Sequence, residues 1–239
     1  MDTSHFDLLF FTDRVSKGRA SLTAEEMHHA MTVMRRKVGD ILTFTDGEGM
    51  LYTGRIAEVG KKEAWLDIID SSEQKTAAFQ LSIAVAPTKS FDRMEWCIEK
   101  LTEIGVHEFI PMLCERSERV RWNAPRVRKI MLSAMKQSKR AYLPQCGMPQ
   151  RFSDIILSAS PGKVRYIAMQ GEKSVAAARH YKPGTDVLIL IGPEGDFTAK
   201  EIAMATEAGF VPLSLGEYRL RTETAAVVAA TTINALNQT

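Results

Sequence analysis

At 239 residues, the chain is long enough for one large domain or two modest ones. Its formal net charge of +2 is only a mild basic bias, so nucleic-acid binding must be argued from local clusters. The 3 cysteines form no CxxC pair, which excludes a disulfide framework and indicates a reducing compartment. With no visible signal peptide and no uncharged run long enough to span a bilayer, we expect a soluble, cytoplasmic protein that binds no membrane.

The first 73 residues are predicted to form a small β-rich unit with one helix. Thr23 and Glu26 have the spacing of a capping box, which predicts a helix from there to about Arg35. Strands are predicted over residues 41–45, 51–59 and 64–69. Several short strands joined by polar turns are typical of a small barrel.

After a polar segment, residues 71–76, which we predict to be a linker, strand and helix patterns alternate. The predicted strands span residues 79–86, 106–112 and 164–169, and the predicted helices span 93–103 and 125–138. Such a series predicts an α/β domain, 74–239, with a mostly parallel sheet covered by helices.

Cations gather in this second domain, on the predicted helix and just before it. They are Arg116, Arg119, Arg121, Arg126, Arg128, Lys129, Lys136, Lys139 and Arg140. An apolar stripe on the helix leaves most of them on its opposite face. Their density favours a track for RNA phosphates, and an ordinary solvated face is the alternative.

The stretch Val187–Ile191 is apolar throughout, which predicts a strand buried on both faces. Gly192-Pro193 ends it, and Thr198 with Glu201 predicts a capped helix beginning at Ala199. Glycines after the strand leave room for a nucleotide-like ligand against backbone amides. The alternative is a tight turn with no ligand.

A short strand, 211–215, is followed by a second glycine-containing loop and an uncharged helix to about Asn237. Together, GPEGDF and LGEYRLRTETA resemble the two signature loops of the SPOUT methyltransferases, in the branch that methylates N3 of a uridine in 16S ribosomal RNA. The family forms are close to GPEGG(F/L) and LG-x-R-I-L-R-T-E-T-A. The chain has Asp196 where Gly is usual and Tyr218 where Arg is usual.

This resemblance, which runs over almost the whole chain, implies a PUA-like RNA-binding barrel in residues 1–73 and a SPOUT domain with a deep trefoil knot in 74–239. It implies S-adenosylmethionine as the cofactor, 16S rRNA within the assembled small subunit as the partner, a homodimer, and no metal. The implied cofactor residues are Met169, Gln170, Gly171, Ile191, Gly192, Pro193, Glu194, Gly195, Leu215, Gly216 and Leu220. Asp196 would either favour the cofactor's sulfonium or cap the following helix.

The family's E-Q-S-x-R segment corresponds to Lys136–Arg140, with Lys in place of the first Glu. From this segment, the basic clusters and the family's D-R-M-E-W pattern we select candidate RNA contacts. They are Arg35, Lys89, Arg93, Arg116, Arg126, Arg128, Lys129, Gln137 and Arg140.

Methylation at N3 of uridine requires the imide proton to leave while negative charge spreads over N3, O2 and O4. Arg221, in the second signature loop, is our first candidate to stabilise that charge. Arg219 is a weaker candidate, because the family has an apolar residue there. Glu194 or Glu223 would take the proton or orient an arginine, and for Glu223 we favour an ion pair; water is an alternative base.

Other functions stay open at this point. One is a SPOUT methyltransferase for another RNA position, such as a ribose 2′-hydroxyl. Another is a non-catalytic RNA-binding or ribosome assembly factor that has kept the fold. A nucleotide-binding enzyme of different chemistry is the weakest alternative, because the sequence has no phosphate-binding loop.

Overall fold

The computed structural model describes residues 8–117, 122–160, 162–171 and 174–238. The chain divides into two compact units: unit 1 comprises Met1–Thr76 and Leu132–Leu143, and unit 2 comprises Ala77–Met131 and Pro144–Thr239. The sequence predicted one division, between 1–73 and 74–239. It did not predict that residues 132–143 join the N-terminal unit.

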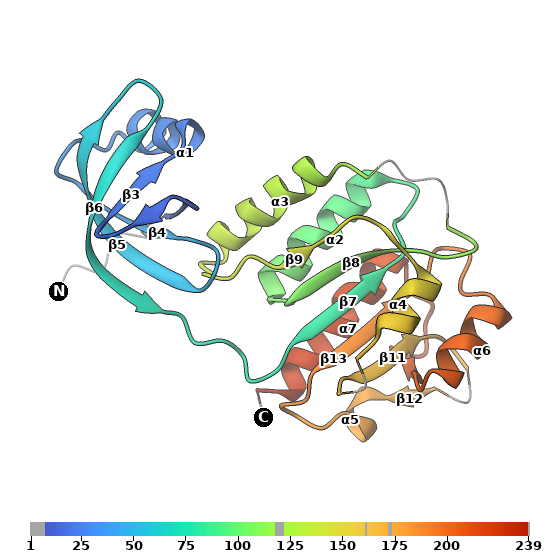
Figure 1. The fold of residues 1–239 in the computed structure, drawn as a ribbon. Coiled ribbons are helices and arrows are strands. Elements are labelled where there is room, and N and C mark those ends of the chain that lie inside the picture. Colours follow the sequence, from blue (N-terminus) through green and yellow to red (C-terminus); the bar gives the residue numbers. More distant parts are fainter. Residues whose placement is uncertain (1–7, 118–121, 161, 172–173, 239) are drawn as a thin grey trace. The chain divides into compact units, whose positions relative to one another are not determined.

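Six strands of unit 1 form a single sheet (Figure 1). They are β1 (Leu9–Phe11), β2 (Val15–Ser16), β3 (Arg19–Leu22), β4 (Ile41–Thr45), β5 (Met50–Val59) and β6 (Ala64–Glu73). Their order is β1-β4-β5-β6-β3-β2, with β1 and β4 parallel and the other described pairs antiparallel. Side chains from five of the strands form one buried core, which contains Phe10, Leu22, Phe44, Ile56 and Leu66, and Val15 of β2 packs against it. The predicted small β-rich unit is confirmed.

The strand β6 extends further than predicted. Residues 71–73 pair with residues 52–50 of β5, so the predicted linker 71–76 is wrong for its first three positions. These positions are polar and exposed, and a strand exposed on both faces lacks the apolar alternation that sequence patterns detect.

The predicted first helix is α1 (Ala24–His28), which continues as a π-helix, η1 (His29–Val33). The Thr23 hydroxyl accepts from the Glu26 N–H at 3.5 Å, as a capping box requires. The reciprocal half of that prediction is wrong. The buried Glu26 carboxylate instead accepts from the Phe11 N–H at 3.4 Å and forms an ion pair with Lys136.

Segment 132–143 is hydrogen bonded into unit 1 around Ala141. The Ala141 N–H donates to Gln74 Oε1 at 2.8 Å, and its carbonyl accepts from the Gly49 N–H at 3.0 Å and the Thr45 hydroxyl at 3.1 Å. Gly49 has a φ of 112°, and a Cβ added there would lie 2.2 Å from the Tyr142 ring. Only glycine fits under this segment.

The sheet of unit 2 contains eight strands in the order β10-β8-β7-β13-β11-β14-β12, with β9 paired to β8. They are β7 (Leu81–Val85), β8 (Glu108–Leu113), β9 (Gln145–Cys146), β10 (Gln150–Arg151), β11 (Val164–Ala168), β12 (Val175–Ala176), β13 (Val187–Ile191) and β14 (Val211–Ser214). Every pairing between described strands of this sheet is parallel. The predicted α/β architecture is confirmed, and β13 is buried throughout, as its apolar run predicted.

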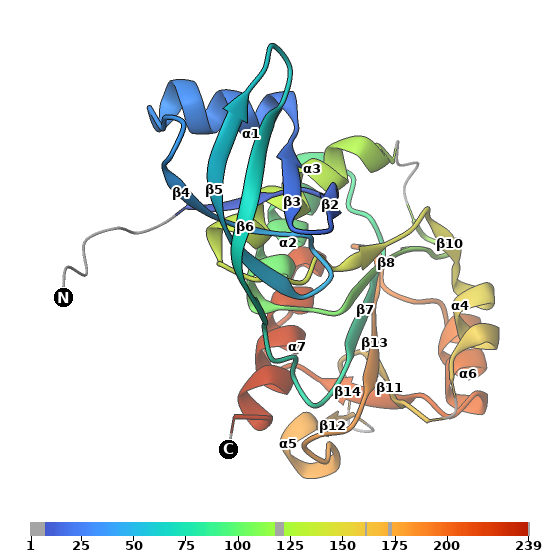
Figure 2. The same cartoon turned by 60° about the vertical axis from the view of Figure 1, so that its left-hand side comes forward.

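Helices cover both faces of this sheet (Figures 1 and 2). The helices are α2 (Phe91–Ile104), α3 (Ala124–Gln137, in unit 2 as far as Met131), α4 (Phe152–Ser158), α5 (Ala177–His180), α6 (Ala199–Glu207) and α7 (Thr222–Leu236). On one face α7 packs against α2, and on the other α4 packs against α6. The capping box predicted at Thr198 is present in both halves. The trefoil knot stays a prediction.

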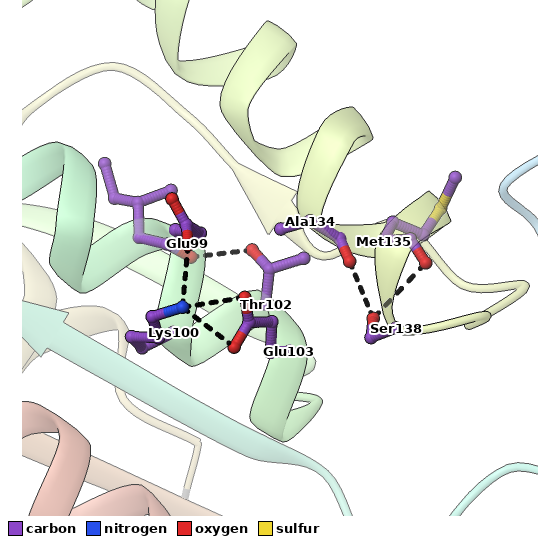
Figure 3. A network of polar contacts seen from close by, with 8 residues as sticks. Glu99, Lys100, Thr102, Glu103, Ala134, Met135 and Ser138 are labelled. Carbon is purple, nitrogen blue, oxygen red and sulfur yellow. Dashed lines mark hydrogen bonds and ion pairs between the residues drawn. The ribbon is translucent and has the colours of Figure 1, made fainter.

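Figure 3 shows hydrogen bonds between near neighbours in α2 and at the end of α3. In α2, Lys100 Nζ lies 2.7 Å from Glu99 Oε1 and 2.9 Å from Glu103 Oε1, and these hydrogen bonds raise the pKa of Lys100. Just after α3, the Ser138 hydroxyl donates to the Ala134 carbonyl at 2.7 Å.

Among the described residues, no helix has the length and apolar character needed to cross a membrane.

Candidate active site

A cavity of about 490 Å³ opens at the carboxyl ends of three adjacent strands of unit 2, β11, β13 and β14. Three segments of the chain form its wall, and each lies at the end of one of these strands. The third segment, after β14, continues into the first turn of α7. The lining residues are Ala168, Met169, Gln170, Ile191, Gly192, Pro193, Glu194, Asp196, Leu215, Gly216, Tyr218, Arg219, Leu220, Arg221, Thr222 and Ala225. Ligands of parallel α/β sheets bind at this edge.

The loop after β13 is shaped by two positions. A Cβ at Gly192 would lie 3.1 Å from the Phe197 ring, a tight contact, so glycine lets the backbone pass close to that ring without displacing it. Asp196 has a φ of 63°, a left-handed conformation that Asp tolerates better than most residues. This explains how Asp replaces the family's usual Gly. Its Oδ1 accepts from the Phe197 N–H at 2.8 Å, whereas Thr198 caps α6, so the predicted helix cap at Asp196 is wrong.

Side chains of the loop after β14 hold the loop after β13. The Thr222 hydroxyl donates to the Gly192 carbonyl at 3.0 Å, and the Arg219 guanidinium donates to the Glu194 carbonyl at 3.0 Å. A second guanidinium, that of Arg116 after β8, donates to the next carbonyl, Gly195, at 2.8 Å. The two signature loops, distant in sequence, therefore form one wall.

The predicted cofactor residues gather at this wall. Nine of the eleven line the cavity, and only Gly171 and Gly195 do not. Sequence reasoning missed the contributions of Ala168, Thr222 and Ala225 to the lining. Thr222 had a signal, because it lies within the intact RTETA segment, but a hydroxyl at a helix start is usually explained as a cap.

The three predicted catalytic residues lie in different environments. Arg221 and Glu194 are exposed and line the cavity. Glu223 is buried and is absent from the lining; its Oε1 lies 4.0 Å from Arg93 Nε, the ion pair favoured from the sequence. Glu223 Oε2 is buried with no hydrogen-bond partner among the described residues. Burial and then the Glu223 charge raise the pKa of neighbouring Cys97 to about 12.

Several candidate RNA contacts in unit 2 have protein partners. Arg93 pairs with Glu223, Arg116 binds the Gly195 carbonyl, and Arg126 forms a bidentate ion pair with Glu95. The Arg126 hydrogen bond lowers the pKa of Glu95. The side chains of Lys89, Arg128 and Lys129 are exposed. Arg119 and Arg121 lie outside the described residues.

The remaining candidates lie in unit 1. Arg35 is exposed, with a φ of 54°, and Gln137 is exposed at the end of α3. Arg140 is half-buried, and burial lowers the pKa of its guanidinium. Within the described part of the chain, that guanidinium has no hydrogen bond or ion pair. Lys136 is held by Glu26, which gives the Lys found in place of the family's Glu a structural role.

Comparison with known proteins agrees with this geometry. The sequence model of the RNA methyltransferase domain family matches residues 75–234, and that of the RNA methyltransferase PUA domain matches residues 22–69. A curated relative, the ribosomal RNA small subunit methyltransferase E of Bacillus subtilis, is 31% identical over 233 residues. The match covers 90% of this chain and 89% of the relative.

Solved structures resemble the whole chain. A probable rRNA-methyltransferase from Porphyromonas gingivalis superimposes with a TM-score of 0.91 at 40% identity, covering 96% of this chain and 98% of the other. A Legionella pneumophila protein described as a methyltransferase, in complex with the cofactor SAM, gives a TM-score of 0.85 at 27% identity, with 96% and 97% covered. The chain therefore belongs to the RNA methyltransferase family, in the group of the ribosomal RNA small subunit methyltransferase E enzymes, and carries their N-terminal PUA domain.

Proposed function

We propose that this protein transfers a methyl group from S-adenosylmethionine to N3 of a uridine in 16S ribosomal RNA, the family's U1498. The observation that carries the proposal is the convergence of both signature loops, joined by the Thr222–Gly192 hydrogen bond, on one cavity. Its volume of about 490 Å³ lies within the range of small-molecule sites. The Legionella relative solved with bound SAM supports the identity of the cofactor.

The lining divides into parts suited to a cofactor with a base and a charged amino acid moiety. Ile191 and Leu220 offer apolar surface, and the backbone after each strand offers N–H and C=O groups around Gly192 and Gly216. S-adenosylmethionine brings an activated methyl group, so the protein's own task is alignment and the handling of charge.

Arg221 is proposed to stabilise the charge that develops on the uracil. As the N3–methyl bond forms and the sulfur–methyl bond breaks, the N3 proton leaves and negative charge spreads to O2 and O4. Arg221 lies on the cavity wall, and its guanidinium makes no hydrogen bond or ion pair with another described residue. Its donors are therefore available to a carbonyl oxygen, which would lower the imide pKa.

Of the two acidic candidates, we assign proton acceptance to Glu194, directly or through a water molecule. Glu194 lines the cavity and is exposed, whereas Glu223 is buried against Arg93 and outside the lining. This ion pair suits Glu223 to hold the start of α7 in place.

RNA binding is proposed to use cations of both units. The exposed side chains of Arg35, Lys89, Arg128, Lys129 and Gln137 and the half-buried Arg140 are the proposed contacts to phosphate and sugar. Arg93, Arg116 and Arg126 already have protein partners; a guanidinium carries five donors, so each could still bind a phosphate with the remainder. We propose that the substrate is the rRNA within the assembled small subunit, in the cytoplasm.

A homodimer is proposed from the character of α7. This helix carries no cation, and its less buried positions include Val227, Val228, Thr231 and Ala235, which are small or apolar. Such a face is suited to burial against a second copy of the chain. Light scattering after size exclusion, at micromolar protein, should give twice the mass of the chain; a monomer would contradict this part.

The test of the function is methyl transfer from labelled S-adenosylmethionine to small subunits purified from cells that lack this gene. The RNA is digested to nucleosides, and the labelled product is identified. We expect the label in 3-methyluridine. Label in a 2′-O-methyl nucleoside would overturn the assigned position, and no label together with no cofactor binding would favour an RNA-binding factor.

A further inference from the structure

Tyr218 is an exposed aromatic residue on the wall of the cavity. Its relative exposure is 82%, and of the large exposed hydrophobic residues in the described part of the chain it alone belongs to the lining. Among the described residues, Tyr218 has no hydrogen bond and no contact with another aromatic ring. Leaving a large aromatic side chain in water forgoes roughly 1.5–3 kcal/mol of burial free energy, so a ligand that covers the face of this ring would recover part of it.

The residues on both sides of Tyr218 are tied to other loops of the cavity wall, Glu217 through its carbonyl and Arg219 through its side chain. The Glu217 carbonyl accepts from Gln170 Nε2 at 3.5 Å, and the Arg219 guanidinium donates to the Glu194 carbonyl at 3.0 Å. The Tyr218 ring is thus exposed and makes no hydrogen bond with another described residue, while the residues beside it are hydrogen bonded to the rest of the wall. Because the neighbouring residues are already tied to the wall, less of the loop has to be ordered when a flat ligand binds.

The ring is also a departure from the family's usual pattern. Where the family's pattern reads Arg followed by Ile, this chain has Tyr218 followed by Arg219. The arginine therefore stands one position later than in the family's pattern, and its guanidinium donates to the Glu194 carbonyl. Position 218 thus offers a flat, neutral face in place of a guanidinium.

We propose that Tyr218 stacks on the target uracil and holds its N3 edge toward the cofactor; the inference rests on the proposed function. An enzyme that acts on a base must first take it out of its stack, and it then reads the base by stacking and by hydrogen bonds to its Watson–Crick edge. N3 lies on that edge, so a ring on the base face leaves N3 and both carbonyl oxygens open to the cofactor and to Arg221.

The adenine of the cofactor is the other candidate to stack on the Tyr218 ring. The apolar parts of the lining that suit an adenine are better covered than Tyr218: Ile191 is 2% exposed, and Leu215 and Leu220 are of intermediate exposure. Tyr218 lies at the solvent side, where the RNA must arrive. The observations therefore favour the substrate base.

The experiment compares Tyr218→Phe, Tyr218→Leu and Tyr218→Ala in the subunit methylation assay, with the affinity for S-adenosylmethionine measured by calorimetry on each variant. Stacking on a base is worth about 1–3 kcal/mol, so kcat/KM for the subunit should fall roughly 5- to 150-fold in the Ala variant. The Leu variant, which keeps apolar volume without a flat face, should fall similarly. The Phe variant should keep wild-type kcat/KM, and cofactor affinity should stay within about twofold in all three.

Each other outcome has a distinct meaning. Cofactor affinity lost in the Ala and Leu variants but kept in Phe would place the ring on the adenine and overturn the inference. Wild-type kcat/KM in the Ala variant would overturn it as well. If the wild-type protein itself forms no 3-methyluridine, the proposed function fails and the inference fails with it, and these two failures are distinguished by the wild-type control.

Discussion

The Thr222 hydroxyl donates a hydrogen bond to the carbonyl of Gly192 over a distance of 3.0 Å. The two residues stand at the ends of different loops: Gly192 directly follows β13, and Thr222 begins α7. Because Thr222 is 5% exposed, the bond is largely shielded from water. Together with the bond from Arg219 to the Glu194 carbonyl, it joins the two signature loops that line the cavity.

Thr222→Val is expected to lower the free energy of unfolding by about 1–2 kcal/mol, because the Gly192 carbonyl loses its partner in a shielded place. Cofactor binding should weaken as well, since the loop after β13 is released on one side. Calorimetric unfolding and titration with S-adenosylmethionine measure the two effects. Thr222→Ser keeps the hydroxyl and is the matched control; equal cofactor affinity in the Val and wild-type proteins would contradict the role of this bond.

Arg221→Ala is expected to reduce the rate of methyl transfer by roughly 10²- to 10³-fold, the cost of removing one donor to a developing oxyanion. Binding of S-adenosylmethionine should be unchanged, because the guanidinium is assigned to the uracil. Single-turnover methylation and calorimetry separate the two quantities. Arg221→Lys keeps a charge without the fork of donors and should recover only part of the rate. An unchanged rate in the Ala variant would remove Arg221 from catalysis.

Asp196→Gly is expected to change the free energy of unfolding by less than about 1 kcal/mol. The variant loses the hydrogen bond from Phe197 but also relieves the left-handed backbone, which costs a residue with a Cβ about 1–2 kcal/mol. Asp196→Val should destabilise the protein, because a β-branched side chain fits this conformation poorly. Asp196→Asn should bind S-adenosylmethionine as the wild type does. Weaker binding by the Asn variant alone would show that the carboxylate attracts the sulfonium.

Much of unit 2 was predictable because its patterns are local. The buried strand Val187–Ile191 and the capping box Thr198–Glu201 are each set by neighbouring residues, and both are confirmed. The helix α2, predicted over 93–103, spans Phe91–Ile104 and is capped by Gly105, whose φ of 91° suits glycine.

What the sequence missed depends on distant partners. The second half of the Thr23 capping box fails because Lys136, far along the chain, takes the Glu26 carboxylate. The membership of segment 132–143 in unit 1 rests on backbone bonds such as those of Ala141, which no side-chain pattern reveals. At the site, the ion pair of Arg126 with Glu95 could not be told from a free cation by composition alone.

Arg140→Gln is expected to weaken binding to 16S rRNA fragments. The slope of the logarithm of the binding constant against the logarithm of the salt concentration should become shallower by about one, the amount expected for one lost phosphate contact. The half-buried guanidinium has no described partner, and its burial lowers its pKa, so a phosphate would supply the missing counter-charge. Arg126→Gln is the comparison: Arg126 already has the Glu95 carboxylate as its counter-charge, so this variant should change the salt slope less than Arg140→Gln does. Equal salt slopes for the Arg140 variant and the wild type would mean that Arg140 does not contact a phosphate.

The Glu95–Arg126 pair predicts a specific pH dependence. The hydrogen bond from Arg126 lowers the pKa of Glu95 in the folded protein, so the folded state binds its proton less readily than the unfolded chain does. The stability from this pair is therefore present above the unfolded carboxyl value, about 4.3, and is lost as the pH falls through the lower folded pKa.

We therefore expect Glu95→Gln to unfold at a lower temperature than the wild type at pH 6, by a small amount because Arg126 is exposed to solvent. The difference should shrink as the pH falls below the unfolded carboxyl value, because the unfolded wild-type chain takes up the Glu95 proton more readily than the folded protein does, whereas the Gln side chain does not titrate. Glu99→Gln is the control on the same helix, where Lys100 keeps a second carboxylate in Glu103. A melting-temperature difference for Glu95→Gln that stays constant down to pH 3 would mean that packing of the side chain, and not its charge, holds Arg126 in place.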